Sequence, residues 1–336
     1  MRVLLLSCVV LTGCVGVAGG EGLDAGPDAL APDAGADAGT SQPVVDAGLD
    51  AGGSQPMPDA GGTSGPTDGG FSTNRGEFFG APRCATAGVT FCDDFEGRAV
   101  GGGPDTASWT TSFWNPGTAQ VKVIGEGARG SRAMRFQIGT GGNKAMMTLK
   151  RVFPMPNNSF WARLFLRLNN RPLPFKWNDQ SNFPLTHWTF AYASGNHVFA
   201  GNNTLRPELR AGGYINRVPL MNVDGMDRAE MGIDDANPPA GQEEIPENEW
   251  ICFELYWGGP TQEMRFFQDG LEHPGLHLTT THTGDNGANP PWPMGEPFDE
   301  LTVGLVMYQT YDKVGPTLSL DLDEIAVDGQ RIGCSR

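Results

Sequence analysis

Apolar and polar residues alternate in several short segments after residue 71, as they do in β-strands that bury one face. The clearest segment covers residues 160–168. One of its faces carries Phe160, Ala162, Leu164, Leu166 and Leu168, and the other carries Trp161, Arg163, Phe165 and Arg167. Further strands are expected at residues 250–257, 263–268, 301–308 and 318–327.

The connections between these segments also favour β structure. Asp269-Gly270 directly follows residues 263–268, and this dipeptide is typical of hairpin turns. No window keeps a helical period for more than a turn or two. Many short strands joined by Gly-, Pro- and Asn-rich connections predict an all-β fold of two antiparallel sheets, a sandwich or jelly roll. We assign residues 72–336 to this domain.

The first residues have the pattern of an exported lipoprotein. Arg2 and the apolar run that ends at Leu11 form a signal peptide of residues 1–13. Leu11-Thr12-Gly13-Cys14 looks like a bacterial lipobox, in which cleavage precedes the Cys and its thiol is acylated. An ordinary signal peptide with an incidental Cys is the alternative. We expect Cys14 to carry lipid that anchors the exported protein to the bacterial cell envelope or surface, because several acyl chains give stable anchoring.

Residues 14–71 are predicted to be a disordered linker. The tripeptide Asp-Ala-Gly occurs six times there, beginning at Asp24, Asp33, Asp37, Asp46, Asp50 and Asp59. Aromatic residues are absent from Gly19 to Gly70, so the segment cannot bury enough apolar surface to offset its ordering entropy. A calcium-binding repeat is the alternative, but the spacing is irregular and no EF-hand pattern occurs.

The net charge of −16 is divided unevenly along the chain. Residues 1–71 hold half of it, which leaves a net charge of −8 for residues 72–336. This acidic balance argues against nucleic acid as a partner. An acidic polysaccharide is not excluded, because Arg206, Arg210 and Arg217 make one part of the domain locally basic.

Four cysteines remain after Cys8 in the signal peptide and Cys14: Cys84, Cys92, Cys252 and Cys334. An even number in an exported domain predicts disulfides, for which three pairings are possible. We favour Cys84–Cys92, which closes a short loop, and Cys252–Cys334, which attaches the last residues to a strand. Zinc is the alternative, but no Cys-x-x-Cys spacing supports it.

Common catalytic motifs are missing from the sequence. It contains no GxSxG, HExxH or GxxxxGK[ST] motif, and no GxGxxG in a strand-to-helix context. Laminarinase-type jelly rolls place Glu-x-Asp-x-x-Glu on one strand to pair two carboxylates. The nearest match here, Asp321-Leu322-Asp323-Glu324, lacks the leading Glu, so this hydrolytic mechanism is not favoured.

A second acidic pattern fits calcium. Asp93-Asp94-Phe95-Glu96 opens the domain, and Asp323-Glu324 lies near its end. The first and last strands of a jelly roll are commonly neighbours. A carboxylate from each, with backbone carbonyls near residues 129–132, would give the oxygen shell that Ca²⁺ prefers. Two solvated acidic turns are the alternative interpretation.

Several short segments occur in an order that is characteristic of one family. Each segment is a weak signal alone, but their shared order is more specific. They are Asp93-Asp94-Phe95-Glu96, Gly130-Ser131-Arg132-Ala133-Met134-Arg135, residues 161–168, His187-Trp188-Thr189-Phe190, Leu209-Arg210-Ala211-Gly212-Gly213, Cys252-Phe253-Glu254-Leu255, Leu322-Asp323-Glu324-Ile325 and Gly333-Cys334. From about Phe91 to Cys334 the chain thereby resembles the secreted fungal cellulose-induced protein and the related glucuronan lyases of polysaccharide lyase family 20. This resemblance implies a concanavalin-like β-jelly roll.

The resemblance also implies specific sites. It places a structural calcium on Glu96 and Asp323, implies a disulfide that matches Cys252–Cys334, and puts His187, Arg210 and Tyr308 in a cleft on the concave sheet. Tyr214 stands where the fungal pattern has Gln, and its side chain can still hydrogen-bond to or stack on a sugar. Glu208 stands where that pattern has His.

These residue types suit β-elimination on a uronic acid. Arg210 would neutralise the C6 carboxylate, because a guanidinium matches a carboxylate bidentately. His187 or Tyr308 would remove the C5 proton or protonate the leaving oxygen. If the resemblance is set aside, Arg210 is equally well explained as a charged residue on the surface of a strand. His187 is then explained as a histidine of the core, and Tyr308 as a packing residue.

The leading hypothesis is therefore a monomeric cell-surface lipoprotein that cleaves or binds a uronic-acid-containing plant or microbial polysaccharide. The alternative is a non-catalytic carbohydrate-binding jelly roll, whose candidate stacking residues are Trp161, Trp188, Trp250, Trp257 and Trp292. Large aromatic residues are, however, also common in β cores. A third possibility, adhesion or envelope structure without sugar, rests on the lipobox and linker alone.

Overall fold

The computed structural model describes residues 70–336 with gaps at 115, 140–142, 170–186, 199–203, 215–217, 225–230, 235–236, 280–296 and 308–317. The expected signal peptide, Cys14 and nearly all of the linker lie outside the described residues, as do Arg217, Trp292 and Tyr308. In the described part of the chain, no helix has the length and apolar character needed to cross a membrane.

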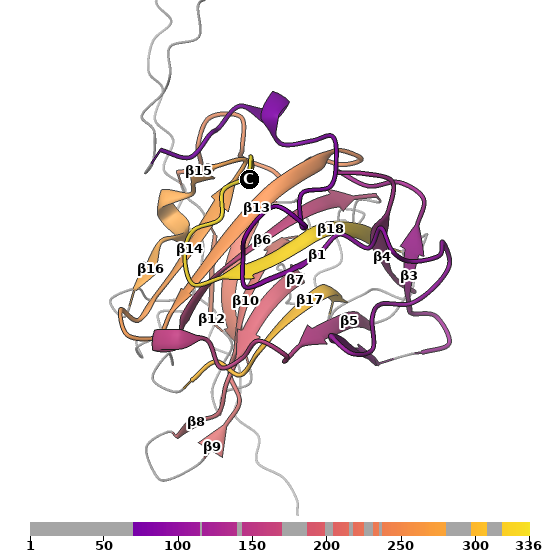
Figure 1. Cartoon of the computed structure of the whole chain (residues 1–336). Helices are drawn as coiled ribbons and strands as arrows, with labels where there is room; N and C mark the ends of the chain where they lie inside the picture. Colours follow the sequence, from indigo (N-terminus) through magenta and orange to yellow (C-terminus); the bar gives the residue numbers. More distant parts are fainter. Residues whose placement is uncertain are drawn as a thin grey trace, which may run out of the picture. The chain divides into compact units, whose positions relative to one another are not determined.

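The prediction of an all-β fold with two antiparallel sheets is confirmed (Figure 1). The larger sheet has nine strands among the described residues. Its order is β15 (Leu271–Glu272), β14 (Glu263–Gln268), β13 (Trp250–Gly258), β6 (Ser159–Leu168), β18 (Leu318–Asp328), β4 (Ala133–Ile138) and β3 (Gln120–Ile124), with β1 (Phe91–Asp93) paired to β18 and β16 (Leu278–Thr279) paired to β14.

The second sheet has seven strands in the described ranges. Its order is β12 (Met231–Asp234), β11 (Pro219–Asp224), β10 (Glu208–Tyr214), β7 (His187–Ser194), β17 (Glu300–Met307), β5 (Asn143–Leu149) and β2 (Trp109–Phe113). Two short strands, β8 (His197–Val198) and β9 (Thr204–Leu205), pair with each other. Single turns of 3₁₀-helix occur at η1 (Arg75–Glu77), η2 (Pro156–Asn158) and η3 (Pro274–Leu276). Strands that are far apart in the chain are thus neighbours in both sheets, as a jelly roll requires.

The five strands expected from the sequence all form, at β6, β13, β14, β17 and β18. Residue 308, the expected last residue of the fourth strand, lies outside the described residues. The turn after β14 also forms as expected, because Asp269 and Gly270 both adopt positive φ, at 47° and 81°. Asp and Gly are among the residues that tolerate this conformation best.

The core lies between the two sheets and is rich in aromatic rings. Phe190 of β7 packs against Phe253 of β13 with ring centroids 5.1 Å apart. Trp257 of β13 donates a hydrogen bond from Nε1 to the carbonyl oxygen of Leu209 on β10 at 3.1 Å. This bond satisfies the indole N–H of a fully buried tryptophan and fixes one sheet against the other.

Alternation in β6 predicted one buried face, but both faces are covered. Phe165, on the outer face, is fully buried and packs in a small cluster with Phe78, Cys252 and Cys334. Both favoured disulfides form, at Cys84–Cys92 and Cys252–Cys334. The second disulfide holds the end of the chain over the outer face of the larger sheet, which explains the additional burial.

Charged groups are also buried beneath this tail. Arg129 and Arg163 both form ion pairs with Glu324, and all three side chains are fully buried. The guanidinium of Arg129 also donates to the main-chain oxygens of Phe78 and Cys334. Burial lowers the pKa of Arg129 to about 10, so it remains charged at neutral pH. Because removing one partner would leave a buried charge unpaired, this cluster fixes the tail in one position.

Candidate functional site

A row of polar side chains crosses the outer face of the seven-stranded sheet. In β10, β11 and β17, Leu209, Met221 and Leu301 turn into the core, so their neighbours turn outward. Backbone register places the outward residues opposite one another across five strands. We call this row the polar face; its members are Asn222, Arg210, Tyr192, Thr302 and Thr148.

Most of the polar face is sheltered from solvent although it lies outside the core. Arg210 is 1% exposed, Tyr192 4% and Asn222 3%. The hydroxyls of Thr302 and Thr148 hydrogen-bond to each other at 2.9 Å. Sheltered polar groups of several kinds on one face are costly unless paired, and they are common in ligand sites. The row is therefore the candidate functional site.

Tyr192 lies at the centre of the row. Lys144 of β5 donates a hydrogen bond from Nζ to its phenolic oxygen at 3.3 Å. Met146 and Val306 pack beside the ring and give it an apolar surround. Burial raises the pKa of Tyr192, and the negative charge of Glu208 raises it further. The phenol is therefore protonated at neutral pH and can donate a proton.

Arg210 is already bound by two carboxylates. Its Nε donates to Glu208 Oε2 at 2.9 Å, and its Nη2 lies 2.6 Å from Asp224 Oδ2. The three groups carry a net charge of −1. The guanidinium thus orients Glu208 and Asp224, and its charge is balanced before any ligand arrives.

Lys144 is different: its Nζ bonds to the Tyr192 hydroxyl, and no ion pair joins it to a carboxylate among the described residues. Its side chain is half-buried and also lies over the Tyr192 ring, with Nζ 5.7 Å from the centroid. Within the described part of the sheet, Lys144 is therefore a cation whose charge is available to an anionic ligand.

The structure brings together some of the residues predicted from sequence and separates others. Arg210 lies opposite Tyr192, whereas His187 begins β7 and pairs with Tyr214. Tyr192 lies five positions after His187, about 16 Å along an extended strand. His187 and Arg210 thus belong to the same sheet but lie at different levels along its strands. The side chain of Tyr214 and the whole of Tyr308 lie outside the described residues.

Sequence reasoning did not select Tyr192, Lys144 or Trp114. A bulge in β7 makes Phe190 and Ala191 both face the core, and this shift turns Tyr192 outward. Simple alternation from Trp188 and Phe190 would have placed Tyr192 inside. Trp114 follows β2, donates its backbone N–H to the Lys144 carbonyl at 3.4 Å, and is 43% exposed. An exposed tryptophan beside the polar face is a stacking candidate.

The tryptophans that were considered for sugar stacking have other positions. Trp188 and Trp257 are fully buried in the core, and Trp161 is 9% exposed beneath Arg265 and Arg331. The ring of Trp250 lies under the guanidinium of Arg167, 4.8 Å away. These four residues stabilise the domain, as the packing alternative stated.

Glu96 and Asp323, the predicted calcium ligands, both lie beside the loop of residues 127–132. Glu96 Oε1 accepts hydrogen bonds from the backbone N–H groups of Ser131 and Arg132 at 2.6 and 2.7 Å. Asp323 Oδ2 accepts one from the N–H of Arg129 at 2.9 Å. Burial raises the pKa of Asp323 to about 8, which a bound cation would reverse.

Three oxygens of this loop region converge near Gly127. A Cβ placed there would lie 2.5 Å from the carbonyl oxygen of Arg132, 2.8 Å from that of Arg129 and 3.0 Å from Asp323 Oδ2. An all-oxygen donor set suits Ca²⁺. The described residues contain no group of three or more His, Cys, Asp or Glu side chains that could hold a metal, so carbonyl oxygens would supply most of the shell.

Asp321, of the laminarinase-like segment, lies in the other sheet. Its carboxylate is fully buried between Arg135 Nε at 2.7 Å and Arg167 Nη2 at 2.8 Å. A bulge in β18 follows, with Glu324 at a φ of 43°. Asp321 is therefore a structural ion-pair partner on β18, away from the polar face.

Comparison with known proteins adds to the description of the fold. No family model and no curated protein matches the chain. Among solved structures, the laminarinase catalytic domain of Thermotoga maritima has a TM-score of 0.43 at 14% identity, over 72% of this chain and 98% of that one. Alginate lyase AlyC3 has a TM-score of 0.37 at 13% identity, over 58% and 74% of the two chains.

A third similar structure is the botulinum neurotoxin serotype D/C binding domain, with a TM-score of 0.39 at 10% identity, over 67% of this chain and 45% of that one. At such identities the similarity concerns the fold alone. The functional conclusion has to come from the chemistry of the polar face.

Proposed function

We propose that the domain binds a uronic-acid-containing polysaccharide on its polar face and cleaves it by β-elimination. The observation that supports this most directly is the position of Tyr192. Its protonated phenol lies in the middle of a sheltered polar row, opposite Arg210 and hydrogen-bonded to Lys144. This arrangement offers a cation, a proton donor and a carboxylate on one sheet face.

Each step of the elimination has a candidate residue. Lys144 neutralises the C6 carboxylate, so that the C5 proton becomes acidic. Glu208 accepts that proton at Oε1, because Arg210 holds its Oε2 and so orients the carboxylate. The C4–O4 bond breaks as the C4–C5 double bond forms, and Tyr192 gives its proton to O4. The phenolate that forms is stabilised by the ammonium of Lys144.

Non-catalytic binding is the second candidate function, and one observation favours it. Tyr192 and Arg210 are almost completely buried, whereas Trp114 and Asp224, at opposite ends of the same sheet, are 43% and 37% exposed. A glycan could contact the exposed ends without reaching Tyr192. The residues of the polar face would then stabilise the sheet.

One experiment separates these functions. The purified protein, with Ca²⁺ present, is incubated with glucuronan, alginate and pectate, and the ultraviolet absorbance of the unsaturated product is followed. A rise with at least one polyuronate and none with a neutral glucan supports the lyase. A flat trace with saturable binding supports the binding module. If no polyuronate gives a rise in absorbance or saturable binding, both proposals are overturned.

The domain is further proposed to hold a structural Ca²⁺ near Gly127. Asp323 and the carbonyl oxygens of Arg129 and Arg132 would hold the ion. Glu96 would act by fixing the loop that presents those carbonyls, because its Oε1 binds two successive N–H groups. The bound ion would neutralise the buried carboxylate of Asp323.

The chain is also proposed to be a lipoprotein of the cell envelope or surface, anchored through Cys14 and acting there as a monomer. The lipobox-like segment and the polar linker support this location. Replacing Cys14 with Ala should release the protein from the membrane fraction. Retention of the variant there would contradict lipid anchoring.

A further inference from the structure

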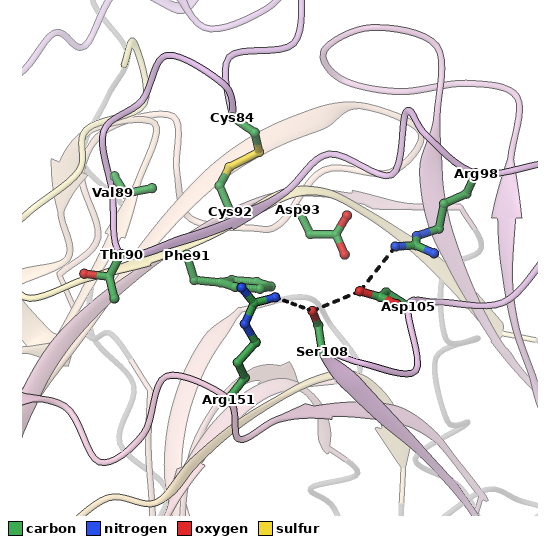
Figure 2. Close-up of a pocket in the computed structure, with 10 residues that line it drawn as sticks. All are labelled: Cys84, Val89, Thr90, Phe91, Cys92, Asp93, Arg98, Asp105, Ser108 and Arg151. Atoms are coloured by element: carbon green, nitrogen blue, oxygen red, sulfur yellow. Dashed lines mark hydrogen bonds and ion pairs between the residues drawn. A yellow bond between two sulfur atoms is a disulfide. The ribbon is translucent and has the colours of Figure 1, made fainter.

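A cavity of about 360 Å³ lies where β1 meets the loop before β2 and the turn after β5 (Figure 2). This volume is within the range of small-molecule sites. Four charged side chains line it: Asp93, Arg98, Asp105 and Arg151. The cavity is separate from the polar face, since none of these residues belongs to that row.

The carboxylate of Asp93 is already bound to groups of the protein. Its Oδ2 accepts a hydrogen bond from Trp109 Nε1 at 2.8 Å, and its Oδ1 accepts one from the N–H of Phe95 at 3.1 Å. The bond from Trp109 ties β1 to β2, and the bond from Phe95 orients the carboxylate. Asp93 therefore has a structural role at the cavity wall.

Asp105, which lines the same cavity, is bound in a similar way. Its Oδ1 accepts from the N–H of Ala107 at 3.2 Å, and its Oδ2 accepts from Ser108 Oγ at 3.1 Å. The hydrogen bond from Ala107 lowers the pKa of Asp105, so this carboxylate stays ionised. Each oxygen of both carboxylates thus already has a donor.

The two guanidinium groups, in contrast, have more hydrogen-bond donors than acceptors to pair with. Arg151 donates one hydrogen bond in the described part of the chain, from Nη1 to Ser108 Oγ at 3.2 Å. Arg98 forms an ion pair with Asp105, with Nη2 3.6 Å from Oδ2, and Arg98 Nε is buried with no acceptor among the described residues (Figure 2). A guanidinium carries five N–H donors, so most of those in this cavity have no acceptor within the described part of the chain.

We propose that this cavity binds an organic carboxylate of the size of a sugar acid, held between Arg98 and Arg151. The planar fork of a guanidinium matches a carboxylate geometrically. The hydroxyl of Ser108 lies between Arg151 and Asp105 in Figure 2 and can also bond a ligand hydroxyl. This site is additional to the polar face and does not depend on lyase activity.

Calorimetric titration of the full chain with sodium glucuronate tests the proposal. Glucuronate should bind saturably, and neutral glucose should not. Arg151→Ala should weaken glucuronate binding roughly tenfold or more, since it removes a charged hydrogen-bonding group. Arg151 is exposed, so the melting temperature of this variant should match that of the unchanged protein. Arg98→Ala should weaken binding similarly.

Two further variants locate the ligand. Lys122→Ala on β3 removes a positive charge at a side chain that does not line the cavity, and it should leave glucuronate affinity unchanged. Lys144→Gln removes the available cation of the polar face. Loss of glucuronate binding in Lys144→Gln with full binding in Arg151→Ala would place the ligand on the polar face and overturn the cavity site. The absence of saturable binding, or equal binding of glucose, would overturn it as well.

Discussion

Tyr192 on β7 lies directly opposite Arg210 on β10, in the middle of the seven-stranded sheet. The resemblance implies that Arg210 acts together with His187 and Tyr308. Because Arg210 is bound by Glu208 and Asp224, we assign it the role of orienting these carboxylates. The proton donor is then the neighbouring phenol, and the cation that meets the substrate is Lys144.

Replacing Tyr192 with Phe should abolish most of the turnover and preserve glycan binding. The change removes the proton donor to O4, and general acids contribute about 10²- to 10⁴-fold to rates. Initial rates from product absorbance and the dissociation constant for the polymer are the two measurements. Tyr256→Phe, on β13 of the other sheet, is the matched control and should retain full activity. Unchanged turnover in Tyr192→Phe would remove this residue from the mechanism.

Tyr192 should ionise at higher pH than an ordinary tyrosine. Burial and the charge of Glu208 raise its pKa, whereas an unperturbed phenol titrates near pH ~10. A pKa raised in the folded state means that ionisation opposes folding, so stability is lost as the pH rises above the unfolded value. The phenolate absorbance of the unchanged protein minus that of Tyr192→Phe isolates this group. A midpoint at or below about pH 10 would contradict the buried environment.

How much of this arrangement could be predicted from sequence depends on the local pattern. The strands β6, β13, β14, β17 and β18 carry clear alternation or β-rich composition, and they form as expected. The short spacing of Cys84 and Cys92, and the positions of Cys252 in a strand and Cys334 near the C-terminus, favoured the two disulfides that form. The outer face of β6 was not predicted to be buried, because the segments that cover Phe165 lie far away in the chain.

The centre of the candidate site was harder to predict, because a bulge changes which residues face outward. Phe190 and Ala191 are successive core residues and shift the register of β7. This shift turns the Tyr192 side chain outward, onto the polar face. The position of Lys144 next to Tyr192 depends on the order β7-β17-β5, which brings strands far apart in the chain to one face. No spacing rule within one segment contains that information.

Replacing Glu208 with Gln should separate binding from chemistry. The proton acceptor at C5 is lost, so turnover should fall by about 10²-fold or more. Binding of a polyuronate should be equal or stronger, because one negative charge is removed from the polar face. Steady-state rates and equilibrium binding give the two values. The control Glu126→Gln also removes one negative charge, at a side chain that is 69% exposed. It should change neither turnover nor polyuronate binding. Weaker polyuronate binding by Glu208→Gln would contradict this prediction, because it would show that the Glu208 carboxylate contributes to glycan binding.

Removing calcium should lower the melting temperature of the folded domain. At a free Ca²⁺ concentration about 100 times the dissociation constant, the ion stabilises the folded state by about 2.7 kcal/mol, or roughly 5–10 °C in a domain of this size. Differential scanning calorimetry with and without a chelator measures the change. Asp323→Asn should abolish the response to Ca²⁺, since the amide cannot balance the ion's charge. Asp328→Asn, at the end of β18, should retain it. An identical melting temperature with chelator and with Ca²⁺ would rule out the site near Gly127.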